Sequence, residues 1–302
     1  MQKQTVAFSK DSSNLFFHIL TKCNLSCTHC YINPDQHGSQ ILDIATIQNW
    51  LSIFKDKARQ TNLVLLGGEP TLHPDLSSVV KFARQMNFKS ITIDTNGYLF
   101  HDILNKIIPD DIDFLSFSLD GATQQTNDAI RGDGCYNAVL SGLKQAVTKG
   151  FTCSMIYTVS DKNIHELEHM PDLVKDLGIK HFFIQVIGMR GESSKKARNL
   201  QVSKEIWRKT IPKVARIIAA QKIVVTYPKV FLDENEPFEC AGNVADNYFI
   251  FPNGRVYQCP ICEDFSLHSY EIKENKLVQT PKINEQDLFK LDIPEGCVMN
   301  KM

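Results

Sequence analysis

The sequence has little net charge, no long apolar run and no block of basic residues. Its 302 residues include 33 Lys and Arg against 34 Asp and Glu, which leaves a formal net charge of −1. A nearly neutral chain without such a block gives no electrostatic footprint for a nucleic acid or a membrane surface. No apolar segment approaches membrane-spanning length, and residues 1–5 carry no apolar signal segment. We therefore expect a cytoplasmic protein with no nucleic-acid and no membrane partner.

The rest of the composition is that of a globular protein with clustered cysteines. With 43% hydrophobic and 22% charged residues, the chain is long enough for one large α/β domain and a smaller unit. Its nine cysteines include a Cys-x3-Cys-x2-Cys and a Cys-x2-Cys cluster, which favours metal ligation in a reducing compartment over disulfides. Cys135 and Cys153 have no partner spacing, and we expect both to be small buried hydrophobes.

The densest cluster, Cys23, Cys27 and Cys30, directly follows the apolar run at residues 15–20. Three thiolates in such a short stretch can hold one soft-metal centre, but they leave a tetrahedral or cubane site one ligand short. A structural zinc site needs a fourth Cys or His, and His29 would reach the metal only by folding back past its own neighbours. The pattern therefore favours an open position that a substrate or cofactor completes, with a zinc site as the alternative.

Apolar runs alternate with helical periodicity along most of the chain. We expect strands at residues 15–20, 62–66, 90–94, 113–119, 152–159 and 181–187. We expect helices at residues 43–60, 75–86, 100–107, 135–149, 164–177 and 204–220. Asp43 is the candidate N-cap of the first helix, and Pro212 is expected to kink or break the last. Six β-then-α units predict an α/β fold, either a partial (β/α)6 TIM-like barrel or an open doubly wound sheet.

Polar and glycine-rich residues gather where the predicted strands end. These stretches are residues 23–30, 67–69, 95–97, 118–121 and 185–191. Active sites of barrel folds collect at the carboxyl ends of the strands. We therefore expect one ligand to span all of these loops.

The C-terminal quarter carries a second cysteine group. Residues 249–257 predict a β-hairpin with an Asn-Gly turn, which returns the chain so that Cys240 and Cys259 can face one site. Cys262 follows within ligand reach, and Cys297 lies far down the chain. Four thiolates suffice for one iron–sulfur cluster, and a closed zinc site is the alternative.

The N-terminal cluster, with Tyr31 after its third cysteine, resembles the cluster loop of the radical S-adenosylmethionine (radical SAM) enzymes. In that family three cysteines hold a [4Fe–4S] cluster, and the amino and carboxylate groups of SAM chelate the open iron. Gly67, Gly68, Glu69 and Pro70 resemble the family's GGEP stretch, which contacts the amino group of the methionyl moiety. A tight strand-to-helix turn with a solvated Glu is the alternative for these four residues.

Further stretches resemble SAM-binding segments of the same family. The SLDG stretch at residues 118–121 implies that Ser118 or Asp120 reaches the ribose, and the downstream Arg131 is implied to pair with the SAM carboxylate. Residue 127 is Asn where the family usually has His, so no role is carried over to it. Other candidate contacts, each with an ordinary turn or barrel lining as the alternative, are Thr95 and Asn96 toward ribose or adenine, and Gln185 and Ile187 toward adenine.

The spacing from Cys240 to Cys259 resembles the opening of the SPASM extension or its shorter twitch form, which bind auxiliary iron–sulfur clusters. The resemblance implies a radical SAM core at residues 1–222 and a small auxiliary-cluster domain at residues 223–302 that contains the hairpin. The tentative auxiliary ligands are Cys240, Cys259, Cys262 and Cys297.

The resemblance implies an enzyme that reductively cleaves SAM and uses the 5′-deoxyadenosyl radical to abstract a hydrogen from a substrate. It also implies a one-electron donor such as flavodoxin or ferredoxin, and a peptide or protein as the substrate. A small-molecule substrate is one alternative; a non-catalytic iron–sulfur or zinc protein with the same fold is the other. No further catalytic residue is identified from the sequence.

Overall fold

The computed structural model describes residues 3, 5–7, 11–194, 200–228, 230–231 and 245–281. The strands in this part of the chain form one sheet, in the order β11-β10-β9-β8-β1-β2-β3-β4-β5-β6-β7. Its seven parallel core strands are β1 (Ser13–Leu20), β2 (Thr61–Gly67), β3 (Ser90–Thr95), β4 (Phe114–Ser118), β5 (Cys153–Val159), β6 (His181–Val186) and β7 (Val224–Thr226).

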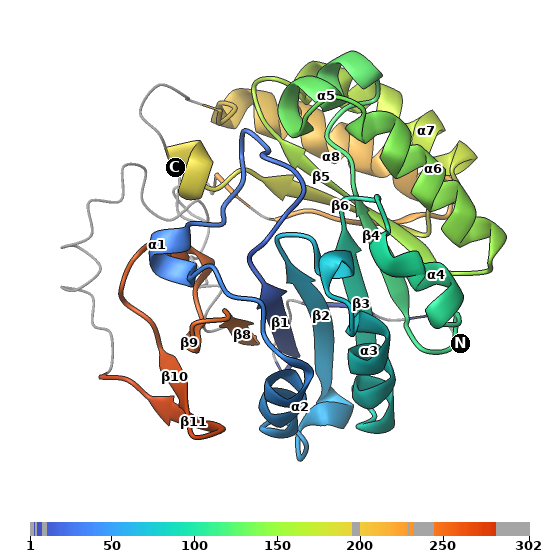
Figure 1. Ribbon diagram of the computed structural model, residues 1–302. Helices are drawn as coiled ribbons and strands as arrows, with labels where there is room; N and C mark the ends of the chain where they lie inside the picture. The colour runs from blue at the N-terminus through green and yellow to red at the C-terminus, as the bar shows by residue number, and fades with distance from the viewer. Residues whose placement is uncertain are drawn as a thin grey trace.

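Helices connect these strands, and the longer ones lie along the outer side of the sheet, whereas the short α1 lies near the C-terminal strands (Figure 1). The helices are α1 (Pro34–His37), α2 (Ile44–Ser52), α3 (Leu76–Gln85), α4 (Ile103–Lys106), α5 (Gln124–Arg131), α6 (Cys135–Thr148), α7 (Met170–Asp176) and α8 (Lys204–Ala220). The parallel strands follow one another in chain order without the reversal that defines a doubly wound sheet. The predicted α/β fold is confirmed, and of its two forms the strand order is that of a partial barrel.

Alternation along each strand separates an outer face from an inner face. On β1, Leu15, Phe17 and Ile19 are fully buried in the main hydrophobic core, whereas Phe16 between them is half-buried. Because successive side chains of a strand point to opposite faces, Phe16 lies on the inner face, away from the helices. The core therefore fills the space between sheet and helices, and the inner face stays partly accessible.

Three predicted helices differ from the observed ones. The first is capped by Asp43, whose side chain accepts a hydrogen bond from the Thr46 amide, but it ends at Ser52, where the bonds tighten to the i−3 type. The segment 164–177 splits into a 3-10 stretch, η4 (Ile164–His169), and α7, because Pro171 in the first turn of α7 has no N–H to donate. The segment 100–107 likewise divides into η3 (Phe100–Asp102) and α4. Helix α8, in contrast, runs through Pro212 without a break.

The C-terminal hairpin is confirmed and joins the core sheet. Strands β8 (Asp246–Ile250) and β9 (Arg255–Tyr257) are antiparallel, and Gly254 in their turn has a φ of +84°. Beyond it lie β10 (Tyr270–Lys273) and β11 (Lys276–Gln279). Strand β8 pairs in parallel with β1, and the rings of Phe16 and Phe249 stack with centroids 4.5 Å apart. The sheet thus continues across the predicted domain boundary at residues 222/223, which stays a prediction.

Buried polar contacts link the amino-terminal ends of four neighbouring strands of the sheet. The side chains of Asn247, Asn14, Asn62 and Ser90 form one chain of hydrogen bonds across β8, β1, β2 and β3, with donor–acceptor distances of 2.9, 3.1 and 2.8 Å. Each of these four side chains has a hydrogen-bond partner, as buried polar groups in proteins generally do. Within the described residues, no helix is long and apolar enough to cross a membrane.

Candidate functional site

The three cysteines of the N-terminal cluster lie half-buried in the loop that follows β1, which we call the cluster loop (residues 21–33). Burial raises the pKa of all three thiols. For Cys23, burial together with the charges of Glu69, Cys27 and Cys30 raises the pKa to about 11. Thiols with raised pKa values are protonated at neutral pH. A metal that binds here therefore displaces protons as it forms thiolate bonds.

The cluster loop fits a [4Fe–4S] cluster better than a single metal ion. In the described part of the chain, no three His, Cys, Asp or Glu side chains stand close enough together to hold one ion. The thiolates of a [4Fe–4S] cluster bind different irons, so they stand further apart than ligands of a single ion. His29, the candidate fourth zinc ligand, points to Asp120 instead, with Nε2 3.0 Å from Oδ2. The donor set that remains is three thiols on one loop.

The two glycines at the end of β2 leave room for the backbone at the end of β1 and the start of the cluster loop. A Cβ on Gly67 would lie 2.1 Å from the carbonyl oxygen of Leu20, and one on Gly68 would lie 2.2 Å from that of Lys22. The amides of Gly68 and Glu69 donate hydrogen bonds to these same two carbonyls, each at 3.0 Å. The close approach that the structure shows at these glycines is to Leu20 at the end of β1 and to Lys22 of the cluster loop.

Glu69 is fully buried, so the alternative of a solvated carboxylate is wrong. Its side chain accepts four hydrogen bonds, from the amide and hydroxyl of Thr71, the hydroxyl of Thr95 (2.8 Å) and the amide of Asn96 (2.7 Å). The Asn96 side-chain amide in turn lies 3.7 Å from the Cys23 sulfur. Glu69 thus fixes the carboxyl ends of β2 and β3 against the cluster loop.

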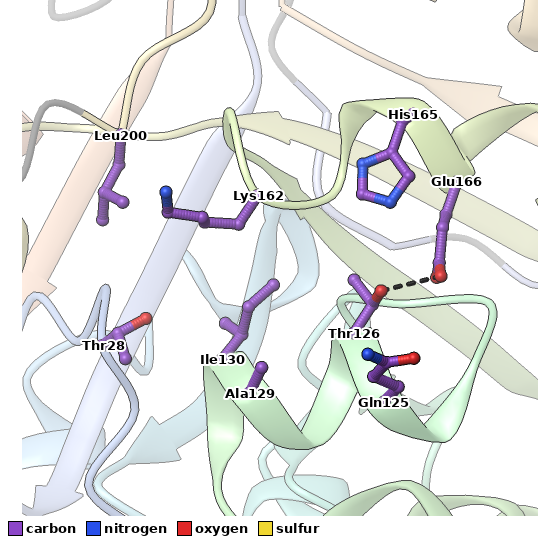
Figure 2. Close-up of a pocket in the computed structure, with 9 residues that line it drawn as sticks. All are labelled: Thr28, Gln125, Thr126, Ala129, Ile130, Lys162, His165, Glu166 and Leu200. Atoms are coloured by element: carbon purple, nitrogen blue, oxygen red, sulfur yellow. Dashed lines mark hydrogen bonds between the residues drawn. The ribbon is translucent and has the colours of Figure 1, made fainter.

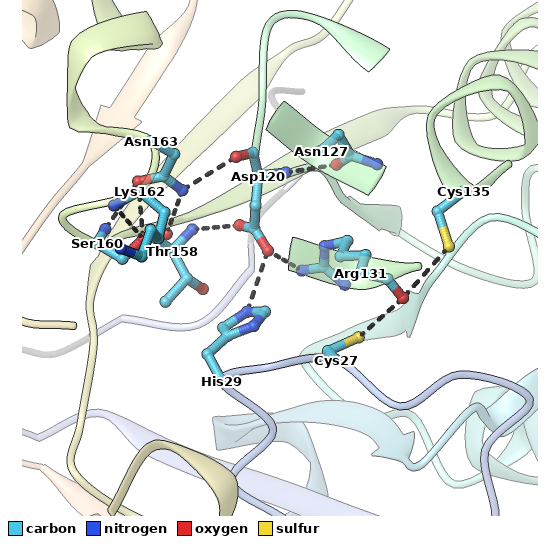
Figure 3. A network of polar contacts seen from close by, with 10 residues as sticks. All are labelled: Cys27, His29, Asp120, Asn127, Arg131, Cys135, Thr158, Ser160, Lys162 and Asn163. Carbon is cyan, nitrogen blue, oxygen red and sulfur yellow. Dashed lines mark hydrogen bonds and ion pairs between the residues drawn. The ribbon is translucent and has the colours of Figure 1, made fainter. Parts of the chain in front are cut away.

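A second buried carboxylate, Asp120, holds the other side of the cluster loop (Figure 3). Its Oδ2 lies 2.7 Å from a guanidinium nitrogen of Arg131 and 3.0 Å from His29, and its Oδ1 accepts a hydrogen bond from the Thr158 amide at 2.7 Å. Burial alone would raise the pKa of Asp120, but Arg131 and His29 lower it to about 2. Asp120 is therefore an anion that orients Arg131 and His29.

Arg131 stands at the end of α5, a helix that the sequence prediction missed. Helix α5 is short and largely polar, and the Thr123 side chain caps it by accepting a hydrogen bond from the Thr126 amide. The Arg131 carbonyl accepts weak hydrogen bonds from two thiols, Cys27 at 3.9 Å and Cys135 at 3.6 Å. Its Nε is buried and has no hydrogen-bond partner among the described residues, so one donor of the guanidinium is unused.

The remaining predicted SAM contacts lie around the same edge of the sheet. Ser118 is half-buried at the end of β4, Gln185 is exposed near the end of β6, and Ile187 is buried just beyond it. Pro70 is buried and opens the 3-10 turn η2 (Pro70–Leu72) after Glu69. Their roles toward SAM stay predictions.

A pocket of about 530 Å³ lies beside the cluster loop, between α5 and η4 (Figure 2). It is lined by Thr28, Gln125, Thr126, Ala129, Ile130, Lys162, His165, Glu166 and Leu200. The Glu166 carboxylate is occupied by hydrogen bonds from the backbone and hydroxyls at residues 122–126. None of the residues predicted to bind SAM lines this pocket, so it is distinct from the predicted SAM site.

A contact that the sequence did not predict joins the cluster loop to the C-terminal unit. The Arg190 guanidinium pairs with the buried Glu263 and lies 5.2 Å from the ring centre of Tyr31. Tyr31 shares a 2.7 Å hydrogen bond with His18 on β1, and the Glu192 amide donates to the Cys30 carbonyl at 2.8 Å. The sequence marked residues 185–191 as a polar loop, but nothing in it linked Arg190 to Glu263.

The C-terminal cysteines are partly within the described residues. Cys259 is half-buried, and Cys262 is 5% exposed in the 3-10 turn η6 (Pro260–Asp264). Both pack in a small apolar cluster with Phe251 and Tyr257, which also contacts Tyr31 of the cluster loop. Cys240 and Cys297 lie outside the described residues. Cys135 and Cys153 are 0% and 1% exposed, as expected for core cysteines.

A family model described as the radical SAM superfamily matches residues 18–174, just over half of the chain. This range contains the cluster loop, the glycines after β2, Asp120 and Arg131. The chain belongs to the radical SAM superfamily, whose members use a [4Fe–4S] cluster and SAM.

Curated relatives and solved structures are similar to this chain over part of their length. The chain is 31% identical over 199 residues to Fe-coproporphyrin III synthase of Methanosarcina barkeri, covering 62% of this chain and 47% of the relative. It is 25% identical over 178 residues to a probable GTP 3′,8-cyclase of Saccharolobus islandicus, covering 59% and 58%. The structure of Streptococcus suis SuiB bound to the precursor peptide SuiA matches with a TM-score of 0.70 at 14% identity, covering 93% of this chain and 64% of SuiB. The last similarity is one of fold.

Proposed function

We propose that this protein is a radical SAM enzyme that reductively cleaves SAM and abstracts a hydrogen atom from a peptide or protein substrate. The observation that carries the proposal is the cluster loop: three half-buried thiols held between two buried carboxylate networks, at an edge where the Arg131 Nε remains unpaired. When bound at Cys23, Cys27 and Cys30, the [4Fe–4S] cluster supplies the electron that cleaves SAM.

The chain's own residues bind and orient SAM in this proposal. Arg131, already fixed by Asp120, presents its free donor to the SAM carboxylate. Gly67, Gly68 and Glu69 hold the backbone that faces the SAM amino group, and Asn96 and Ser118 line the ribose side. Because Asp120 and Glu69 take their hydrogen bonds from the protein, both orient these groups without rearrangement when SAM binds.

The substrate class has two candidates. A peptide is favoured by the C-terminal unit, which continues the core sheet as β8–β11, and by the similarity of fold to SuiB, whose structure contains a precursor peptide. A small molecule is favoured by the curated relatives, which are named for a porphyrin and for GTP. We further propose an auxiliary iron–sulfur cluster at Cys240, Cys259, Cys262 and Cys297, and a flavodoxin or ferredoxin as electron donor.

Electron paramagnetic resonance of the reduced protein tests SAM binding at the cluster. We expect the spectrum of the anaerobically reconstituted protein to change when SAM is added, because SAM completes the open iron. Cys27→Ala should remove the SAM-dependent change. Cys135→Ala is the matched control, since that thiol contacts the same Arg131 carbonyl but lies outside the cluster loop. Wild-type spectra that are identical with and without SAM would contradict the proposal.

A further inference from the structure

One row of side chains crosses the inner face of the sheet just below the site. Strand pairing places Asp94 on β3 beside Ser116 on β4, Ser116 beside Ser154 on β5, and Ser154 beside His181 on β6. Residues paired across strands share a face, so all four side chains belong to the inner face. We call this set the inner row. It has no part in the SAM contacts proposed above.

Asp94 is the carboxyl group of the inner row, and it has no cationic partner in the described part of the chain. Its side chain is partly exposed, and the hydroxyl of Ser116 donates a hydrogen bond to it. Burial, together with the nearby charge of Glu69, raises the pKa of Asp94 to about 7. Ser154, next in the row, is 1% exposed, and its hydroxyl oxygen has no hydrogen-bond partner. The inner row thus holds an acid without a cationic partner among the described residues and, two strands away, an unpaired hydroxyl.

The histidines on the inner face do not supply the missing positive charge. Burial lowers the pKa of His18 on β1 to about 3 and that of His181 to about 4, so both rings are neutral at physiological pH. The Nε2 atom of His181 also shares a hydrogen bond with the Thr226 hydroxyl, 2.8 Å away.

The two arginines near the site form ion pairs with carboxylates other than Asp94. Arg131 pairs with Asp120, and Arg190 pairs with Glu263. A ligand that reaches Asp94 therefore meets a carboxyl group that pairs with no cation among the described residues. Burial of such a group is costly without a partner, and a bound cation removes that cost.

The inner row lies between the cluster loop and the N-terminal segment. At the strand ends away from the cluster loop, the hydroxyls of Thr5 and Thr92 are 3.2 Å apart, and Lys3 donates to the carbonyls of Pro109 and Ile112. Asp94 precedes Asn96 by two residues, which corresponds to about 7 Å along a strand. Asn96 contacts Cys23, so a ligand on the inner row lies next to the place where the radical forms.

We propose that Asp94 binds a cationic nitrogen of the substrate, an ammonium or guanidinium group such as that of a lysine or arginine side chain, with the Ser116 and Ser154 hydroxyls beside it. This inference rests on the proposed radical SAM function, because it places the substrate on the same inner face. It favours a peptide with a basic side chain over a polyanionic small molecule, since a phosphate or carboxylate would meet a like charge.

Two small probes that differ in charge test the inference on the reconstituted protein with SAM bound. N-acetyl-lysinamide carries the ammonium group, and N-acetyl-norleucinamide presents the same chain without it. We expect the lysine probe to bind at least about tenfold more tightly, within the range of a charge-assisted hydrogen bond. Its binding should also release protons at pH 7, because a cation lowers the pKa of Asp94. Calorimetry in two buffers of different ionisation enthalpy measures both effects.

Two variants separate Asp94 from general charge effects. Asp94→Asn keeps the shape of the side chain and should abolish the preference for the lysine probe and the proton release. Asp172→Asn removes an exposed carboxylate on α7 and should retain both. Equal binding of the two probes to the wild type, no binding of the lysine probe, or a preference that survives in Asp94→Asn would overturn the inference. If Asp94→Asn fails to fold, the comparison of the two probes on the wild type still tests whether a cationic nitrogen is preferred.

The proposed function is read out separately in the same preparations. Formation of 5′-deoxyadenosine by the wild type and by Asp172→Asn tests SAM cleavage without reference to the probes. Equal binding of the two probes together with intact SAM cleavage would overturn only the role of Asp94. Loss of SAM cleavage in the wild type would count against the proposed function itself.

Discussion

Arg131→Ala should abolish most SAM binding and destabilise the fold. The substitution leaves Asp120 fully buried with only His29 remaining of its two side-chain partners. Removing one partner of a buried ion pair typically costs about 3–5 kcal/mol. Loss of the contact with the SAM carboxylate should weaken binding by about 1.5–3 kcal/mol. Chemical denaturation measures the free energy of unfolding, and calorimetry with SAM measures the affinity.

Arg84→Ala is the matched control for this prediction. Arg84 pairs with Asp113 at 2.9 Å, but both side chains are partly exposed, and such pairs contribute about 0–1 kcal/mol. The pH dependence adds a second check. Asp120 has a lowered pKa of about 2, so its pairing stabilises the wild type above about pH 4 and is lost as the pH falls toward 2. An Arg131→Ala variant as stable as Arg84→Ala, with unchanged SAM affinity, would remove Arg131 from the site.

The second large effect concerns iron content. If both cysteine groups hold [4Fe–4S] clusters, the reconstituted wild type should contain about eight irons, and a variant with Ala at Cys23, Cys27 and Cys30 should retain about four. That variant should also keep the charge-transfer absorbance of an iron–sulfur centre.

Other results for this triple variant would indicate a different role for the C-terminal cysteines. Zinc in place of iron would indicate a structural site. A folded, colourless and metal-free variant would contradict an auxiliary cluster. Cys297→Ala in the triple-variant background, with iron content and spectrum unchanged, would point to an auxiliary cluster with an open position.

Much of the core was predictable because its signals are local. Each strand from β1 to β6 is an apolar run between turns, and α6 and α8 follow their predicted bounds closely. Helix α5 was missed because it is short and polar, and its amphipathic pattern spans only eight residues. Strand β7 has three residues, too few for a period to appear. The pairing of β8 with β1 joins segments more than 200 residues apart, and no local pattern encodes that contact.

The candidate site was predictable in its members but not in its contacts. The positions of Cys23, Glu69 and Arg131 followed from motifs. The partners did not: Glu69 bonds within the protein, and Asp120 faces Arg131 and His29. These contacts depend on how four loops meet at one edge of the sheet. Whether a carboxylate is buried depends on how these loops pack together. The spacing of residues along the sequence does not reveal that packing.

We propose above that the cluster loop supports reductive cleavage of SAM. The most direct test is to incubate the anaerobically reconstituted protein with dithionite and SAM and to measure 5′-deoxyadenosine and methionine over time. We predict that both products accumulate in equal amounts in the wild type and in Cys135→Ala, and that neither forms in Cys27→Ala. A wild type that yields no 5′-deoxyadenosine while its cluster is spectroscopically intact would contradict SAM cleavage by this protein and favour a non-catalytic iron–sulfur protein.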